Sequence, residues 1–301
     1  MIRSFSEILK IASEKGPKTI AVAVAQDVEV LTAVSNAKKL GIVNVILVGD
    51  KEEIETIAKK INIDLSGMEI IDEKDKVQAC MTSVELVSSG KAQLVMKGFV
   101  DTSVILKAVL DEKIGLRTGN VLSHVGVFDV KGYDRLFLLT DAAMNLAPNL
   151  EQKKQIVENA VLLAKAMGNE NPKIAILAAV EKVNPKMQAT VDAAELEKMN
   201  KEGWLPDCIV GGPFAFDNAV SVEAAKHKGI EHPIAGLADI LVVPTIEAGN
   251  MLYKSFVFFA KSKNAGIIVG AKAPIVLASR ADSDEAKLNS IAIGVLLAAK
   301  N

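Results

Sequence analysis

The stretch TIAVAVAQDVEVLTAVSNAKKLGIVNVILVG, residues 19–49, decides the fold class. Its two ends are continuous apolar runs, which is the pattern of parallel strands buried on both faces. Between them Val28, Leu31 and Val34 recur at helical spacing, and Gly41 ends the helix. A strand, a helix and a second strand in this order predict an α/β fold with a mostly parallel sheet.

The same alternation continues along the rest of the chain. One exception is the short Lys-Gly-Tyr-Asp connection at 131–134, which predicts a hairpin and hence an antiparallel pair of strands. Pro148 and Asn149 interrupt the pattern near residue 145 and divide the chain into two α/β units. Further helices are expected near 74–89, 103–112, 150–167, 188–202, 219–228 and 248–262.

Composition excludes several classes of protein. The chain has 301 residues, half of them apolar, and a formal net charge of −2 with both signs scattered. Without a basic stripe, nucleic acid is not the expected partner. No apolar run approaches the length of a membrane span and no signal peptide is evident, so a cytoplasmic location is expected. Cys80 and Cys208 are widely separated, and no histidine spacing suggests a metal site.

Parallel sheets bind ligands beyond the carboxyl ends of their strands, so the loops after the apolar runs are the places to search. The first such loop follows AQLVM. It places Lys97 at the strand end, Gly98 where the backbone must turn, and Thr102 or Ser103 as the cap of the next helix. The loop is either an ordinary strand–helix connection or an anion site at a helix N-terminus.

Two further groups of loops carry candidate residues. Arg117, Ser123 and His124 surround the start of one strand, and Asp141 terminates the next. His124 is interpreted first as a structural histidine, and Asp141 as a residue that caps or closes its loop. The loop PTIEAGN, with Glu247, Gly249 and Asn250, opens a helix where small residues permit close approach of a phosphate or a pantetheine arm.

The stretch SRADSDEAKLNS (279–290) precedes the last helix. Asp282 or Ser283 is a good N-cap, and Asp284 with Glu285 complements the helix dipole. Arg280 does not fit this account, because the dipole disfavours a cation beside a helix N-terminus. An anionic ligand gripped by arginine and helix amides together resolves the conflict.

Together these loops resemble the phosphate acetyltransferase/phosphate butyryltransferase family, closest to the butyryl-transferring members. The segments that carry the resemblance are LVMKGFVDTS (94–103), GGPFAFDNAV (211–220), ADILVVPTIEAGNMLYK (238–254) and PIVLASRADSDEAKLNSIA (274–292). The resemblance implies two α/β domains around a cleft, like the isocitrate/isopropylmalate dehydrogenases, and a homodimer or higher homo-oligomer. It places the first domain at 1–141 plus 278–301 and the second at 142–277.

The resemblance also implies a reaction, the reversible transfer of a short-chain acyl group, butyryl preferred, between CoA and inorganic phosphate in a ternary complex. CoA and phosphate are then substrates, and no cofactor or metal is expected. By match to the family, Ser279 contacts the thiol sulfur or the oxyanion and Arg280 holds phosphate. The expected substrate-binding residues are Lys97, Gly98, Thr102, Ser103, Arg117, Ser123, Glu247, Gly249, Asn250 and Asp282.

The chain departs from the family at one position. Ungapped alignment on Ser279 places Ala286 where acetyl-transferring members carry their catalytic aspartate. The base is therefore expected at Asp284, with Asp282 and Glu285 as alternatives. Other readings are phosphate acetyltransferase specificity, a non-catalytic acyl-CoA-sensing domain, and a dehydrogenase of the same fold, which would need clustered aspartates for a metal.

Overall fold

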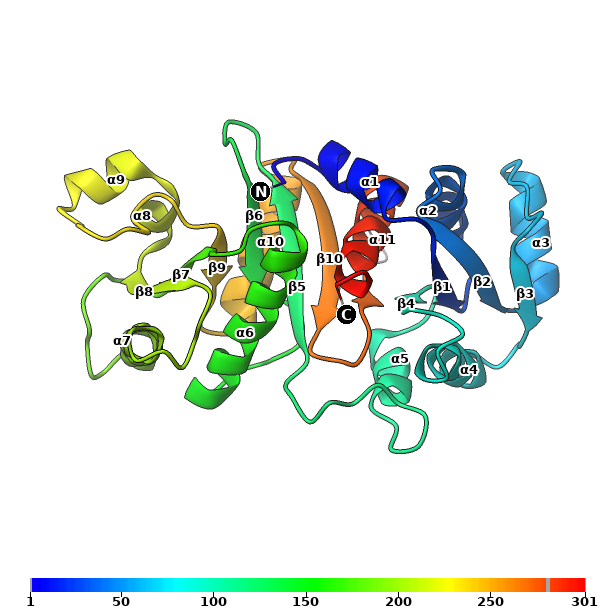
Figure 1. The fold of residues 1–301 in the computed structure, drawn as a ribbon, viewed down its shortest axis with the longest axis horizontal. Coiled ribbons are helices and arrows are strands. Elements are labelled where there is room, and N and C mark those ends of the chain that lie inside the picture. The colour runs from blue at the N-terminus through cyan, green and yellow to red at the C-terminus, as the bar shows by residue number, and fades with distance from the viewer. Residues whose placement is uncertain (1, 280–281, 301) are drawn as a thin grey trace. The chain divides into compact units, whose positions relative to one another are not determined.

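The computed structural model describes residues 2–279 and 282–300. The chain forms two compact α/β units (Figure 1). The N-terminal unit comprises 5–120 and 265–301, and the central unit comprises 1–4 and 121–264. Among the helices of the described ranges, none is both long enough and apolar enough to cross a lipid bilayer.

The chain passes between the units earlier than the predicted boundaries at 141/142 and 277/278. Segment 121–141 belongs to the central unit, because its two strands pair with each other and the second pairs with a strand at 240–242. Segment 265–277 belongs to the N-terminal unit, because its last strand pairs with one at 94–97.

The sheet of the N-terminal unit has the order β3-β2-β1-β4-β11-β10. All neighbours are parallel except β10, which runs antiparallel to β11. The predicted strands at both ends of the 19–49 stretch are confirmed, and their core positions are almost fully buried. The strands are β1 (Lys18–Ala23), β2 (Val43–Gly49), β3 (Glu69–Asp72), β4 (Leu94–Lys97), β10 (Lys263–Val269) and β11 (Ile275–Val276).

Helix α11 (Asp284–Ala298) is the central helix of this unit. It is buried on nearly every side, and it packs on the sheet and against α1 and α2. Gly294 permits the close approach to the sheet, since a Cβ there would lie 3.1 Å from side-chain atoms of Leu94 and Val276. The other helices are α1 (Phe5–Glu14), α2 (Val28–Lys39), α3 (Lys51–Lys60), α4 (Lys76–Ser88) and α5 (Thr102–Val109).

The sheet of the central unit has the order β5-β6-β9-β7-β8. The predicted hairpin is confirmed, because β5 and β6 are antiparallel neighbours, while β6, β9, β7 and β8 are parallel. The strands are β5 (Ser123–Asp129), β6 (Leu136–Thr140), β7 (Lys173–Leu177), β8 (Ile209–Phe214) and β9 (Ile240–Val242).

One predicted helix of the central unit is broken in two. The expected helix at 219–228 is replaced by α8 and α9, because Ser221 adopts extended backbone and its hydroxyl accepts the Ala224 N–H to start a new helix. The helices are α6 (Leu150–Ala166), α7 (Gln188–Lys201), α8 (Phe216–Val220), α9 (Val222–His227) and α10 (Ile246–Phe258).

Five aromatic residues pack in the core of the central unit: Phe128, Phe137, Phe214, Tyr253 and Phe256. The ring of Phe128 meets Tyr253 and Phe256 edge-on, at centroid distances of 4.9 and 5.0 Å. Edge-to-face pairs stabilise a core beyond the apolar area they bury. This cluster attaches α10 to β5 and β6.

Strand β8 lies at the edge of the central unit's sheet, so alternate N–H groups of its backbone point away from β7. Side chains of α7 accept two of them. The Val210 N–H donates to Asn200 Oδ1 at 3.1 Å, and the Gly212 N–H donates to Glu197 Oε2 at 3.0 Å. These outward donors are therefore satisfied within the unit.

Candidate active site

Lys97 lies at the carboxyl end of β4, as predicted, but its side chain does not extend into solvent. It is only 5% exposed, and Nζ donates to the carbonyl oxygens of Gly98 and Val100, both at 3.2 Å. The lysine therefore places a positive charge inside the loop that follows β4.

Gly98 is required where it stands, because the loop rests directly on the end of β1. Its N–H donates to the Ala23 carbonyl at 2.8 Å, and a Cβ would lie 2.2 Å from the Val24 oxygen. Val24 itself is fully buried with φ +57°, a left-handed conformation that is an outlier for a β-branched residue. Such strain persists only where surrounding structure imposes it, and it concentrates at functional sites.

The predicted caps of α5 are wrong. Asp101 occupies the N-cap position and makes no side-chain cap hydrogen bond, while Thr102 is the first helical residue. Thr102 is half-buried and Ser103 is exposed, so both hydroxyls lie in the first turn of α5. The N–H groups of this turn are therefore not occupied by the predicted side-chain caps.

The loop after β11 lies at the same edge of the sheet, because β11 is parallel to β4 and Val276 pairs with Met96. Ser279 is half-buried, and its backbone N–H donates to Asp282 Oδ2 at 2.7 Å. Arg280 lies outside the described residues. The structure thus brings the Lys97 loop and the Ser279 loop to one edge, as strand topology predicts.

The acids of this loop have different surroundings. Ser283 is the N-cap of α11, and its hydroxyl accepts the Ala286 N–H at 3.2 Å. Asp282 holds the loop together through the Ser279 N–H. Asp284 begins the helix and is half-buried, and no described residue hydrogen-bonds to its carboxylate. Of the two aspartates, only Asp282 has a carboxylate that accepts a hydrogen bond from a described residue.

Arg117 does not join this group. Its loop is attached to the β10–β11 connection through the Lys272 N–H, which donates to the Leu116 carbonyl at 2.8 Å, and through Thr118 Oγ1, which donates to Gly270 at 2.6 Å. That connection precedes β11 and lies at the amino end of the strand. Arg117 is exposed at the edge of the sheet opposite to Ser279, so its predicted place in this site is wrong.

In the central unit, the loops after β6 and β9 meet at one edge. Asp141 is 3% exposed and accepts the N–H groups of the next loop, from Ala143, Met144 and Asn145, at 2.9–3.1 Å. The Asn145 amide donates to it as well, at 2.6 Å. Asp141 therefore closes its own loop, which is one of the two interpretations offered from sequence.

The PTIEAGN loop packs onto this closed turn. A Cβ on Gly249 would lie 2.5 Å from the Asp141 carbonyl oxygen, and Asn250 Nδ2 donates to the Ala142 carbonyl at 3.3 Å. Glu247 is exposed in the first turn of α10, where its own N–H and the Thr245 hydroxyl lower the pKa of its carboxyl. The three predicted residues thus share one edge of the sheet, but only Glu247 presents a charged side chain.

Ser123 and His124 start β5 at this same edge and are buried. Ser123 is fully buried and its hydroxyl accepts the Asn159 amide at 2.9 Å, so the predicted contact with substrate is wrong. His124 is 4% exposed, with its ring 5.8 Å from that of Tyr253. The burial of His124 agrees with its interpretation as a structural histidine.

Sequence reasoning missed Val24 and Lys287. Lys287 is 4% exposed in α11, and Nζ donates to the Asp282 carbonyl. A signal was present, because a lysine in a helix that is apolar on nearly every side is unusual. The strain at Val24 had no signal, since the sequence there reads as an ordinary strand end.

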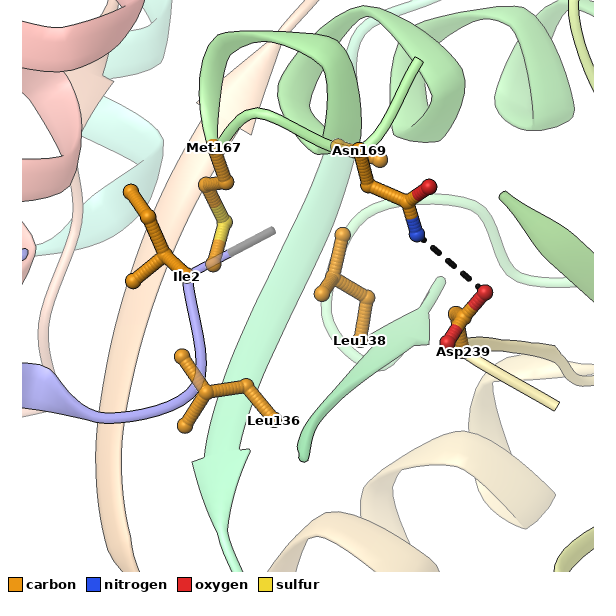
Figure 2. Close-up of a pocket in the computed structure, with 7 residues that line it drawn as sticks. Ile2, Leu136, Leu138, Met167, Asn169 and Asp239 are labelled. Carbon is orange, nitrogen blue, oxygen red and sulfur yellow. Dashed lines mark hydrogen bonds between the residues drawn. The ribbon is translucent and has the colours of Figure 1, made fainter. Parts of the chain in front are cut away.

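A small cavity in the central unit is distant from these loops. Figure 2 shows its lining by Ile2, Leu136, Leu138, Met167, Asn169 and Asp239, near the amino ends of β6 and β9. Its volume of about 20 Å³ holds about one water, so it is not a substrate pocket. In the described ranges, no group of three or more His, Cys, Asp or Glu residues is placed to hold a metal ion.

Comparison with known proteins decides the family. The family profile described as Phosphate acetyl/butaryl transferase matches residues 4–82 and 73–295. The chain belongs to this family. The Phosphate butyryltransferase of Clostridium beijerinckii is 52% identical over 301 residues, all of both chains, and that of Clostridium acetobutylicum is 52% identical over 298 residues, 99% of each. The predicted resemblance is confirmed.

Solved structures of the family share the fold. A branched-chain phosphotransacylase from Enterococcus faecalis matches with a TM-score of 0.84 and 36% identity, over 93% of this chain and 99% of that one. A 4-hydroxythreonine-4-phosphate dehydrogenase from Burkholderia phymatum matches with a TM-score of 0.55 at 13% identity, over 93% and 98%. The second likeness concerns the fold alone, and it confirms the dehydrogenase-like architecture of this acyltransferase.

Proposed function

We propose that the chain catalyses reversible transfer of a short-chain acyl group, with butyryl preferred, between CoA and inorganic phosphate. The observation that carries this proposal is the 52% identity, over the full length of both chains, to a relative named phosphate butyryltransferase. The loops after β4 and β11 supply the polar residues that such a reaction needs at one edge of a sheet.

In the direction that forms acyl phosphate, a phosphate oxygen forms a bond to the thioester carbonyl carbon of acyl-CoA. The carbon–sulfur bond breaks, and the CoA thiolate leaves. In reverse, the thiol proton must be removed before sulfur attacks the acyl phosphate. We assign Ser279 to the sulfur or oxyanion and Arg280 to phosphate. A hydrogen-bond donor aimed at the developing oxyanion stabilises the transition state more than the ground state.

Asp284 is the proposed acid–base group. Its carboxylate accepts no hydrogen bond from a described residue, whereas Asp282 accepts the Ser279 N–H and so shapes the loop. Asp284 also stands in the first turn of α11, close in sequence to Ser279. A group that exchanges a proton with substrate must be within hydrogen-bond reach of it and not engaged elsewhere.

The remaining proposed substrate-binding residues are fewer than those expected from sequence. In the N-terminal unit they are Lys97, Gly98, Thr102 and Ser103, with Asp282 as a loop-shaping residue. In the central unit they are Glu247, Gly249 and Asn250. Arg117 and Ser123 are not retained. CoA and phosphate act as substrates in this proposal, which requires no cofactor.

Release of CoA from butyryl-CoA in the presence of phosphate tests the proposal. We expect phosphate-dependent thiol release from the wild type, and a loss of kcat of about 100-fold or more for Asp284→Asn. Arg280→Ala should raise the phosphate KM strongly. Acetyl-CoA as a parallel substrate tests acyl preference, which rests on about 0.8 kcal/mol per buried methylene.

Matched variants separate the assignments. Asp282→Asn is compared with Asp284→Asn, and near-full activity of Asp284→Asn together with loss of activity in Asp282→Asn would transfer the base role to Asp282. Absence of phosphate-dependent release from the wild type would instead favour a non-catalytic acyl-CoA-binding domain. An unchanged phosphate KM in Arg280→Ala would remove its phosphate role.

Location and assembly are part of the same proposal. We place the enzyme in the cytoplasm, as a homodimer or higher homo-oligomer. Self-association is supported by a group of exposed apolar side chains on and after α10, at Met251, Phe258 and Phe259, with exposed fractions of 65%, 54% and 88%. Exposed apolar groups of this size mark interaction surfaces more often than free surface.

A further inference from the structure

Three lysines of the described ranges are almost fully buried: Lys97, Lys153 and Lys287, at 5%, 5% and 4% exposure. Burial of an ammonium costs several kcal/mol unless an opposite charge or enough hydrogen-bond acceptors compensate it. The partner of each lysine therefore indicates why it is tolerated.

Among the described residues, Lys287 has one hydrogen-bond partner. Nζ donates to the backbone carbonyl of Asp282, and no ion pair reaches it from any described residue. The undescribed positions are Met1, Arg280, Ala281 and Asn301, none of which has an acidic side chain. A neutral carbonyl satisfies one of the three donors of an ammonium and none of its charge.

The position of Lys287 follows from the packing of α11. Gly294 lies against Leu94 and Val276 of the sheet. Lys287 precedes it by two helical turns, on the same face and about 11 Å nearer the helix start. The carboxyl end of β4 lies about 10 Å from Leu94, in the same direction as the start of the helix. Lys287 therefore lies at the carboxyl ends of β4 and β11, next to Asp282.

The helix makes this charge more costly still. The amino end of α11 carries a partial positive charge, so a cation in its first turns is disfavoured by the dipole. Volume-conserving replacement of an uncompensated buried charge by an apolar side chain is often stabilising. The carboxylates of Asp284 and Glu285 in the first turn complement the dipole. An anion held at the amino end of α11 would offset the buried charge of Lys287.

We propose that Lys287 is a positioning residue for the phosphate group, inorganic phosphate in one direction and the phosphoryl group of the acyl phosphate in the other. Its ammonium holds the Asp282 carbonyl, which shapes the loop containing Ser279 and Arg280, and its charge favours an anion over the helix start. The inference rests on the proposed function and adds a residue to it.

The test replaces Lys287 by Met, which keeps the length of the side chain and removes the charge. We expect the phosphate KM to rise about tenfold or more, equivalent to 1.4 kcal/mol or more, with the butyryl-CoA KM changed less than about twofold. Without ligand, the melting temperature should stay the same or rise. Stabilisation by phosphate, relative to chloride at equal ionic strength, should be lost.

Lys287→Arg is the rescue variant, because it keeps the charge, and it should recover part of the phosphate affinity. Lys153→Met is the matched control with an unchanged phosphate KM. The inference is overturned by an unchanged phosphate KM in Lys287→Met, or by an equal rise in the KM of butyryl-CoA, which would point to the CoA phosphates. If Lys287→Met does not fold, a failure of Lys287→Gln to raise the phosphate KM overturns it equally.

Melting with phosphate alone keeps this inference distinct from the proposed reaction. If the wild type releases no CoA but is stabilised by phosphate, and Lys287→Met is not, the reaction is wrong and the anion site stands. If CoA release is normal and phosphate stabilises both proteins equally, the reaction stands and the role of Lys287 is wrong.

Discussion

Lys153 in the central unit and Lys287 in the N-terminal unit are buried to the same degree and have opposite surroundings. Lys153, on α6, lies 2.6 Å from Asp192 on α7, and Gln188 donates to the other oxygen of that aspartate at 2.7 Å. Among the described residues, Lys287 contacts a single carbonyl. The first charge is compensated by an ion pair, and the second is the one that we propose a phosphate group offsets.

The surroundings of the two lysines indicate different reasons for burying a charge, one structural and the other functional. A compensated pair holds two helices together and needs nothing further, although breaking it is costly. An uncompensated charge lowers stability in the absence of ligand, and such sites are retained where binding or catalysis requires them. Lys97, which donates to the carbonyls of Gly98 and Val100, lies at the same edge of the sheet as the candidate residues.

The largest expected effect comes from breaking the compensated pair. Lys153→Met leaves Asp192 buried without its counter-ion, so the free energy of unfolding should fall by about 3–5 kcal/mol. Urea denaturation measures this change in the free energy of unfolding. Lys153→Met combined with Asp192→Leu should recover much of the loss, and a double variant no more stable than the single one would contradict this account of the pair.

Gly98→Ala tests whether the position of the Lys97 loop matters for activity. The added methyl would lie 2.2 Å from the Val24 oxygen, so the loop must move away from β1. Displacement of a reacting group by about 1 Å can cost about 100-fold in rate, and we expect a loss of that order in kcat/KM. Gly132→Ala is a control for strain of the backbone alone, because Gly132 has φ +96° in a hairpin turn with no atom near its Cβ position. Comparable activity of the two variants would argue against the loop's role.

His232 represents a third arrangement, a half-buried group whose charged form is disfavoured by burial. Burial lowers the pKa of its imidazole, although the carboxylate of Glu197, 3.9 Å away, acts in the opposite direction. The unfolded chain takes up a proton below about pH 6.5 that the folded chain resists, so stability should fall as the pH drops below that value.

Urea midpoints at about pH 7.5 and about pH 5.5 should differ less in His232→Gln than in the wild type. This effect is the smallest of the three, because the side chain retains some exposure and the glutamate offsets part of the shift. An identical difference in both proteins would show that other groups control the acid side of the stability profile.

The fold was predictable because its strands are buried on both faces. Continuous apolar runs such as 19–25 have no other easy interpretation in a chain of alternating strands and helices. The break at Ser221 was not predictable from periodicity, since apolar spacing continues through it and only the local serine cap divides the helix. The unit boundaries were misplaced because they depend on which strands pair, a long-range property.

The candidate site was predictable to the extent that strand order determines it. Lys97 and Ser279 each follow a strand, where ligand-binding loops were expected. That these two strands are parallel neighbours was not predicted, because the strand before Ser279 was assigned to the second domain. Arg117 was misplaced because its loop is held at the opposite edge by two hydrogen bonds to residues far away in sequence. One joins the Lys272 N–H to the Leu116 carbonyl, and the other joins the Thr118 hydroxyl to the Gly270 carbonyl. The burial of Ser123 by Asn159 is likewise a tertiary contact with no local signal.

The side chains that cover the outer backbone of β8 have a consequence for assembly. An exposed strand edge is a template onto which another chain can add a strand, and growth of this kind leads to domain swapping or fibrils. Because Asn200 and Glu197 already occupy the outward N–H groups of Val210 and Gly212, a second chain finds no row of free donors there. Copies of this protein should therefore associate through side-chain surfaces, in a closed assembly and not an extending sheet.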